Sequence, residues 1–128
     1  VGLNGGLASV RDAAAHLGPV DGVMMGRGAY GDPAGLRAVG ALVHGRPTGP
    51  LDAADLVDRM TAYAERHMAA GGRLAQVTRH MVNLFTGAPG ARRWRQILSE
   101  ASTRPNAGPG LLREALTAVD LSALPKAA

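Results

Sequence analysis

The chain has 128 residues, of which 46% are apolar and 19% charged, and it has no apolar run long enough for a membrane-spanning helix. It contains no cysteine, which excludes disulfides, thiolate metal sites and a cysteine nucleophile within these residues. Fourteen basic residues against ten acidic ones give a net charge of +4, and all but one of the basic residues are arginine, which suits phosphate recognition. We therefore expect a cytoplasmic protein with an anionic partner and no membrane contact.

The first part of the chain predicts two strand–helix units. Residues 1–3 form a short apolar strand, and Ser9 can cap the helix that follows it. Residues 20–25 form a second short apolar strand, and Pro33 begins another helix. Strands this short and this apolar favour a parallel sheet covered by helices, because both strand faces would then be buried.

Residues 45–50 have the composition of a linker and mark the predicted boundary between domains 1–46 and 47–128. The second domain predicts about four helices. Asp52 caps the first, Gly87 ends the second, the third runs from Gly90 to about Ser102, and Pro109 opens the fourth. Their predicted apolar stripes are, in order, Leu56, Met60 and Tyr63; Leu74, Val77, Met81, Leu84 and Phe85; Ala91, Trp94, Ile97, Leu98 and Ala101; and Leu111, Leu112, Ala115, Leu116 and Val119.

Glycine-rich turns follow both predicted strands: Asn-Gly-Gly at residues 4–6 and Gly-Arg-Gly at residues 26–28. In a β/α barrel the loops after adjacent strands lie side by side, and backbone N–H groups with no Cβ in the way can close on a phosphate. Alternatively, each glycine merely permits a tight turn. The occurrence of both turns in phase, with an arginine in the second, favours the phosphate site.

Arginines dominate residues 59–95, where seven of them stand against one acid, Glu65. On the third predicted helix Arg92, Arg93 and Arg95 fall opposite the apolar stripe. An exposed helix face is usually charged only because it is hydrated, but neighbouring charges of one sign destabilise a helix unless an anion balances them. The pattern therefore predicts contact with a polyphosphate such as RNA, whose affinity would fall steeply with salt.

The other polar and aromatic residues predict no chemistry of their own. The four histidines have no pair at metal-ligand spacing, so no metal site is expected. Trp94 and Tyr63 lie on apolar stripes and are expected in the core instead of stacking on bases. No acid–base pair indicates catalysis within the chain, and no catalytic residue is predicted.

Several short motifs carry a resemblance to a known family: LNGGL at residues 3–7, DGVMMGR at 21–27, RHM at 79–81, LFTG at 84–87 and PGAR at 89–92. The first two resemble the end of the flavin-binding barrel in tRNA-dihydrouridine synthases. The others are similar to the helical domain of the A-type branch of that family. The match covers most of the chain, and its helical part is the more distinctive.

The resemblance implies an α/β plus all-α fold, in which the last two β/α units of a TIM barrel (residues 1–46) precede a small C-terminal helical bundle (residues 47–128). A whole barrel needs about 250 residues, so we expect this chain to be a C-terminal fragment. The family's catalytic cysteine would lie upstream. The isolated fragment is therefore expected to be inactive, and the intact enzyme is expected to be a monomer.

The implied reaction is that of a flavin-dependent oxidoreductase: NADPH reduces FMN, which passes a hydride to the C5=C6 bond of a D-loop uridine in tRNA. The resemblance places the FMN phosphate and the tRNA on two residue sets: Asn4, Gly5, Gly6, Gly26 and Arg27 for FMN, and Arg79, Arg92, Arg93 and Arg95 for RNA. Two alternatives remain at this point. One is another FMN-dependent TIM-barrel oxidoreductase that acts on a small molecule, and the other is a non-catalytic RNA-binding module.

Overall fold

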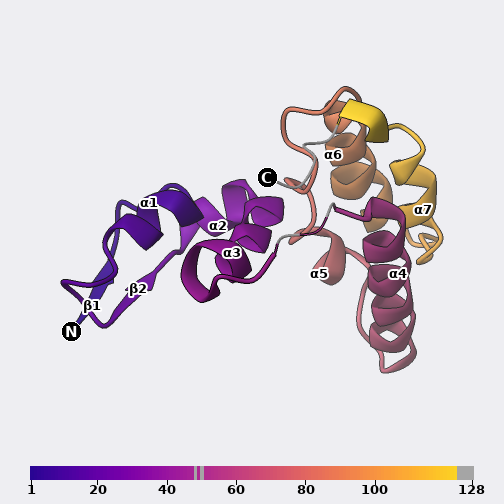
Figure 1. Cartoon of the computed structure of the whole chain (residues 1–128). Helices are drawn as coiled ribbons and strands as arrows, with labels where there is room; N and C mark the ends of the chain where they lie inside the picture. The colour runs from indigo at the N-terminus through magenta and orange to yellow at the C-terminus, as the bar shows by residue number, and fades with distance from the viewer. Residues whose placement is uncertain (48, 50, 124–128) are drawn as a thin grey trace. The chain divides into compact units, whose positions relative to one another are not determined.

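The computed structural model describes residues 1–47, 49 and 51–123, whose contacts form two compact units, one before and one after residue 50. Thr48 and Pro50 of the predicted linker lie outside the described residues, as do residues 124–128 of the predicted second domain. Figure 1 labels the helices and strands. Within the described ranges, no helix combines the length and the apolar character needed to cross a bilayer.

The first unit contains a two-stranded sheet and short helices. In chain order its elements are β1 (Gly2–Asn4), α1 (Val10–Ala15), β2 (Gly22–Met24), α2 (Arg27–Gly31), the 3₁₀ helix η1 (Pro33–Ala38) and α3 (Val39–His44). The strands pair in parallel, as predicted, with Asn4 opposite Met24 (Figure 1). Parallel pairing of consecutive strands requires a crossover connection, and α1 supplies it.

Local hydrogen bonds explain where the helices of this unit begin. Ser9 Oγ accepts from Asp12 N at 3.0 Å and caps α1, as predicted. Asp32 Oδ1 accepts from Gly35 N at 3.2 Å and caps η1. Residues 26–28 are not the simple turn that the sequence suggested, because Arg27 begins the five-residue helix α2. Two of its five residues are glycine, a poor helix former, so its composition gave no helix signal.

The strands are less covered than predicted. Leu7, Val10 and Ala13 are the buried apolar residues of this unit within the described chain. Met24 is 49% exposed, and Val23 is only partly buried. The expectation that both strand faces are buried is therefore wrong for this chain, because α1 packs on β2 and one helix cannot cover both faces of a sheet.

The second unit is helical. Its elements are α4 (Ala53–Ala69), α5 (Ala75–Thr78), α6 (Ala91–Glu100), the 3₁₀ helix η2 (Ala101–Thr103), α7 (Leu111–Leu116) and the 3₁₀ helix η3 (Leu121–Ala123). Both α4 and α6 pack against α7, and α5 packs against α6. Asp52 Oδ1 accepts from Asp55 N at 2.9 Å and caps α4, as predicted.

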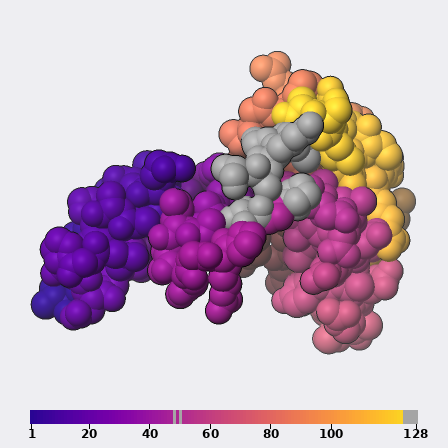
Figure 2. All heavy atoms as spheres, viewed as in Figure 1, coloured from indigo at the N-terminus to yellow at the C-terminus, as the bar shows by residue number. Residues whose placement is uncertain are grey.

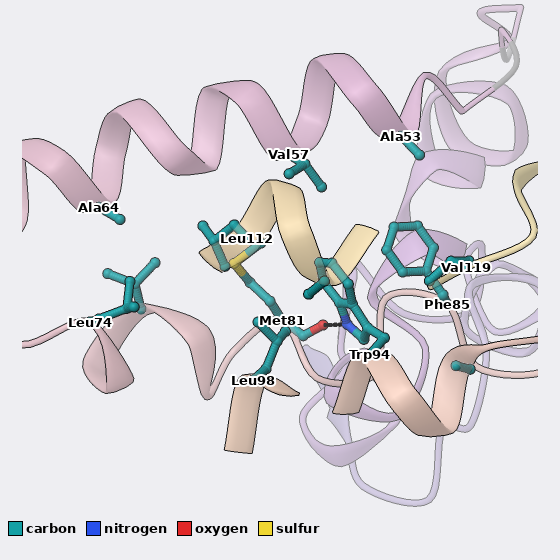
Figure 3. Packing of buried hydrophobic residues seen from close by; sticks show 13 residues of the cluster. Ala53, Val57, Ala64, Leu74, Met81, Phe85, Trp94, Leu98, Leu112 and Val119 are labelled. Carbon is teal, nitrogen blue, oxygen red and sulfur yellow. Dashed lines mark hydrogen bonds between the residues drawn. The ribbon is translucent and has the colours of Figure 1, made fainter. Parts of the chain in front are cut away.

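Trp94 lies in the core of this unit, as predicted from its stripe position (Figure 3). Its side chain is fully buried, and its indole Nε1 donates to the Met81 carbonyl at 3.0 Å. The ring of Phe85 meets it edge to face, with centroids 4.7 Å apart. Val57 from α4 and Leu112 from α7 are buried in the same cluster, so one apolar core joins the helices.

The predicted stripe of α4 is wrong by one residue. The buried side chains of α4 are those of Ala53, Val57, Thr61 and Ala64. Met60 is only partly buried, and Tyr63, which was expected in the core, is 50% exposed. The predicted residues have larger side chains than the ones that are buried. Helix α4 packs against α7, and the side chains at such a contact set how closely the two helices approach.

Residues 74–87 bury most of the predicted apolar stripe but do not form one continuous helix. Leu74, Val77, Met81 and Phe85 are buried as expected. The α-helix nevertheless ends at Thr78, and the chain continues in turns, for example with Leu84 N bonded to the Met81 carbonyl. That carbonyl also accepts from Trp94, so tertiary bonding has replaced regular helix geometry.

Candidate functional site

The loops that follow β1 and β2 meet at one edge of the sheet. Because Asn4 pairs with Met24 at the ends of the parallel strands, both loops leave the sheet at the same level. They line one open hollow of about 600 Å³. All five residues predicted to bind FMN line it: Asn4, Gly5, Gly6, Gly26 and Arg27. The structure thus brings the two predicted turns together in space.

The glycines of the hollow leave backbone open to a ligand. A Cβ added to Gly5, Gly6 or Gly26 would meet no atom within 4 Å. Gly5 and Gly6 also have positive φ angles of 103° and 71°, which L side chains rarely adopt. Any other residue at positions 5 and 6 would strain the backbone and place carbon in the open space.

Gly28 holds the two loops together, a role that was not predicted. A Cβ at this position would lie 2.6 Å from the Leu7 carbonyl oxygen and 3.0 Å from that of Ala8. The first turn of α2 therefore packs backbone to backbone against the loop that follows β1. The signal in the sequence was the second glycine of the Gly-Arg-Gly turn, which only the folded chain places beside Leu7.

Arg27 gives the hollow its positive charge. Its side chain is exposed, and none of the ion pairs among the described residues uses it. The carboxylate that lines the hollow, Asp32, is engaged in capping η1 through Gly35 N. A free guanidinium beside unsubstituted glycine backbone suits an oxyanion such as a phosphate.

The outer face of α6 is basic. Arg92, Arg93 and Arg95 are all exposed, as predicted, while Trp94 and Leu98 are buried on the opposite face. Arg93 Nη1 donates to Gln96 Oε1 at 3.0 Å. Within the described part of the chain, no carboxylate forms an ion pair with any of the three arginines.

Arg79, the fourth residue predicted to bind RNA, lies outside α6. It follows the last residue of α5, and its Nε donates to His80 Nε2 at 3.1 Å. Together with Arg73 and Arg104 it lines a second hollow of about 480 Å³. Arg104 could not be singled out from the sequence, because only the turns after α6 bring it back to Arg79.

Comparison with known proteins identifies the family. The family model described as "Dihydrouridine synthase (Dus)" matches residues 1–120. The chain belongs to the dihydrouridine synthase family. The resemblance that the sequence motifs suggested is thus confirmed, for the helical unit as well as for the sheet.

Several relatives carry the name tRNA-dihydrouridine(20/20a) synthase. The protein from Salmonella typhi is 43% identical over 89% of this chain, and that from Escherichia coli K12 is 43% identical over 91%. The protein from Xanthomonas axonopodis pv. citri is 44% identical over 92%. The chain spans about a third of the length of these dihydrouridine synthases, with 34%, 34% and 35% of each covered.

Proposed function

We propose that this chain is the C-terminal part of a tRNA-dihydrouridine synthase. Residues 1–46 would end an FMN-binding TIM barrel, and residues 47–128 would form a helical tRNA-binding domain. The observation that carries the proposal is the first hollow, where residues from two strand ends, predicted to bind one phosphate, line the same space. The exposure of Met24 on β2 supports it as well, because further barrel strands and helices would cover the sheet.

The residues of the first hollow fit the phosphate of FMN. Gly5, Gly6 and Gly26 let the backbone approach an anion closely, and Arg27 adds a guanidinium that can bind two phosphate oxygens. Gly28 lets the two loops lie in close backbone contact, so both can face the same phosphate. When bound, FMN supplies the hydride chemistry that reduces the C5=C6 bond of a tRNA uridine, with NADPH as the reductant.

The basic face of α6 would contact tRNA. Arg92, Arg93 and Arg95 carry three positive charges on one exposed face, and a polyanion relieves their mutual repulsion. A small-molecule substrate gives no reason for such a face. The chain has no cysteine, so the proton-donating cysteine that the resemblance implies would belong to the rest of the enzyme.

The FMN site can be tested on the whole enzyme with Arg27→Gln. Because a charged hydrogen bond to phosphate is lost, FMN affinity should fall by about tenfold. Arg11→Gln is the matched control, since it removes the same charge from an exposed side chain of α1 that does not line the hollow. Flavin absorbance after gel filtration measures the bound FMN. Equal FMN content in the two variants would contradict the assignment.

A second pair separates phosphate contact from backbone strain. Gly5 and Gly18 have similar positive φ angles, 103° and 115°, and an added Cβ meets no atom within 4 Å at either. Gly5→Ala and Gly18→Ala should therefore destabilise the protein to a similar extent. Only Gly5→Ala should weaken FMN binding, because only Gly5 lines the hollow.

The reaction itself can be tested by mass spectrometry of tRNA that lacks dihydrouridine. The whole enzyme with NADPH should raise the mass of a D-loop uridine by two hydrogens. If the protein binds FMN but leaves tRNA unchanged and unbound, a small-molecule oxidoreductase is the better account. If it binds tRNA but no FMN, it is an RNA-binding module.

A further inference from the structure

We propose that the hollow lined by Arg73, Arg79 and Arg104 binds backbone phosphates of RNA, and that the Tyr63–His67 ring pair beside it carries an unpaired base. The proposal rests on the proposed function in taking RNA as the partner. It adds a second RNA contact, distinct from the outer face of α6, and assigns it to an unpaired stretch of the strand.

Three separate segments supply the charge of this hollow. Arg73 lies in the loop after α4, Arg79 follows α5, and Arg104 follows η2. No aspartate or glutamate lines the hollow with them. Like charges gathered by the fold repel one another, and in the absence of a carboxylate an anionic ligand relieves that repulsion.

Other arginines of the same unit show the contrast. Arg59 pairs with Asp55 at 2.9 Å, and Arg113 pairs with Asp58 at 2.7 Å. The hydrogen bond from Arg113 to Asp58 raises the pKa of that guanidinium above its usual value. Within the described ranges, none of the three hollow arginines takes part in an ion pair. The helical unit thus neutralises Arg59 and Arg113, whereas the three arginines of the hollow, like those on the outer face of α6, have no carboxylate partner among the described residues.

Hydrogen bonds connect this hollow to His67. Gln76 Oε1 accepts from Arg73 N at 2.9 Å and lies 2.8 Å from His67 Nε2. Because that oxygen can only accept, the second bond requires a proton on His67 Nε2. A Cβ at Gly72 would overlap the imidazole ring, so a side chain there would displace His67 from its present position. The backbone that carries Arg73 is thereby fixed beside the ring.

Tyr63 and His67 form an aromatic surface next to these cations. Their rings are parallel to within 5°, with centroids 6.3 Å apart, and Tyr63 is 50% exposed. The C-terminal end of α4 and the loop after it, in pink in Figure 2, lie on the surface of the second unit. Aromatic rings beside a cationic groove are the arrangement by which proteins bind single-stranded nucleic acid, whose bases stack while its phosphates meet arginines.

The position of the hollow indicates how one RNA could use both contacts. Arg92 and Arg93 lie at the first turn of α6, whereas Arg104 follows its last residue by way of η2. A helix rises about 1.5 Å per residue, so the ten residues 94–103, which belong to α6 and η2, separate the two contacts by roughly 15 Å. One RNA molecule can span that distance and neutralise both sites.

The first test is Arg73→Gln combined with Arg104→Gln in the whole protein. Binding of tRNA is followed by fluorescence anisotropy at several salt concentrations. Loss of two phosphate contacts should lower affinity about tenfold or more near 0.1 M salt and reduce the slope of log K against log salt by roughly 1.5 to 2. The control, Arg11→Gln with Arg113→Gln, makes the same charge change away from the hollow and should change affinity less than about twofold.

The second test concerns the aromatic pair. Tyr63→Ala should weaken binding of tRNA about tenfold, whereas Tyr63→Phe, which keeps the ring, should bind as the wild type does. A short oligouridylate should compete with tRNA for the wild type but only weakly for the double arginine variant. Inorganic phosphate and a fully paired RNA duplex should compete poorly with oligouridylate for the wild type at matched phosphate concentration.

The outcomes separate this inference from the proposed function. If the double arginine variant and its control bind tRNA equally, or if inorganic phosphate competes as well as oligouridylate, the second site is wrong. If, in addition, Arg92→Gln with Arg93→Gln lowers the affinity for tRNA, the proposed function stands without the second site. If the wild type does not bind tRNA at all, the proposed function itself fails. Thermal unfolding of each variant verifies that affinity is compared between folded proteins.

Discussion

The two units of the chain differ in how much of their structure they support by themselves. Three apolar side chains are buried in the first unit, and both of its strands remain partly exposed. Thirteen apolar side chains are buried in one cluster of the second unit, around Trp94 and Phe85. Because apolar burial is the dominant favourable term in folding, the second unit should be stable alone, whereas the first should depend on contacts with segments outside it.

The largest expected effect comes from separating the units. Residues 51–128 expressed alone should unfold in one cooperative transition, as small domains with a single core do. Residues 1–50 expressed alone should show no protected backbone amides, because an uncovered two-stranded sheet is marginal in water. Hydrogen exchange followed by NMR measures both. Slow exchange in residues 1–50 would remove the contrast between the units.

The next effect concerns the centre of the second core. Trp94→Ala should lower the free energy of unfolding by about 3–5 kcal/mol, because it deletes a fully buried ring and its hydrogen bond to Met81. Trp94→Phe retains an aromatic ring and should be less destabilising. Urea denaturation of the helical unit provides the measurement. A loss below about 1 kcal/mol for Trp94→Ala would mean that this core does not depend on the ring.

Two glycines with the same backbone angle sharpen the comparison further. Gly87 and Gly90 both have φ of 89°, but an added Cβ is unobstructed at Gly87 and overlaps the Ala118 carbonyl at Gly90. Gly87→Ala should cost about 1–2 kcal/mol of strain, and Gly90→Ala should cost that amount plus the displacement of Ala118. If both variants lose the same free energy of unfolding in urea denaturation, the backbone around Ala118 can shift at little cost to admit the added Cβ.

The smallest expected effect compares two helix caps of similar geometry. Asp52→Ala should lower the stability of the helical unit by about 1 kcal/mol, because Asp55 N loses its acceptor. Ser9→Ala removes the same kind of bond from Asp12 N in the first unit. It should accelerate amide exchange in α1 without moving the denaturation midpoint of the helical unit. A shift of that midpoint would indicate that the two units unfold together.

Most elements of this fold could be predicted from local sequence patterns. The caps at Ser9 and Asp52, the parallel strands and the two faces of α6 follow from residues close in sequence. The buried face of α4 did not, because its choice of small side chains depends on α7. The helix predicted over residues 74–87 failed for a related reason, since the Met81 carbonyl bonds to an indole from α6.

The candidate sites divide in the same way. The five residues of the first hollow could be predicted because each turn follows its own strand, and parallel pairing then brings both turns to one edge. The grouping of Arg79 with Arg104 could not, because it depends on the path of the chain after α6. Tyr63 was assigned to the core from its position on the predicted apolar stripe, although half of it is exposed in the fold.

Gly28 has a consequence for how this chain tolerates mutation. Carbonyl oxygens of Leu7 and Ala8 occupy the space that any side chain at position 28 would need. A library of all single substitutions should therefore reject every residue except glycine there, while it accepts many at Arg11. Position 28 would then be as intolerant of substitution as a catalytic position, although glycine has no side chain that could take part in a reaction. At this position, intolerance to substitution would measure how closely two stretches of backbone approach.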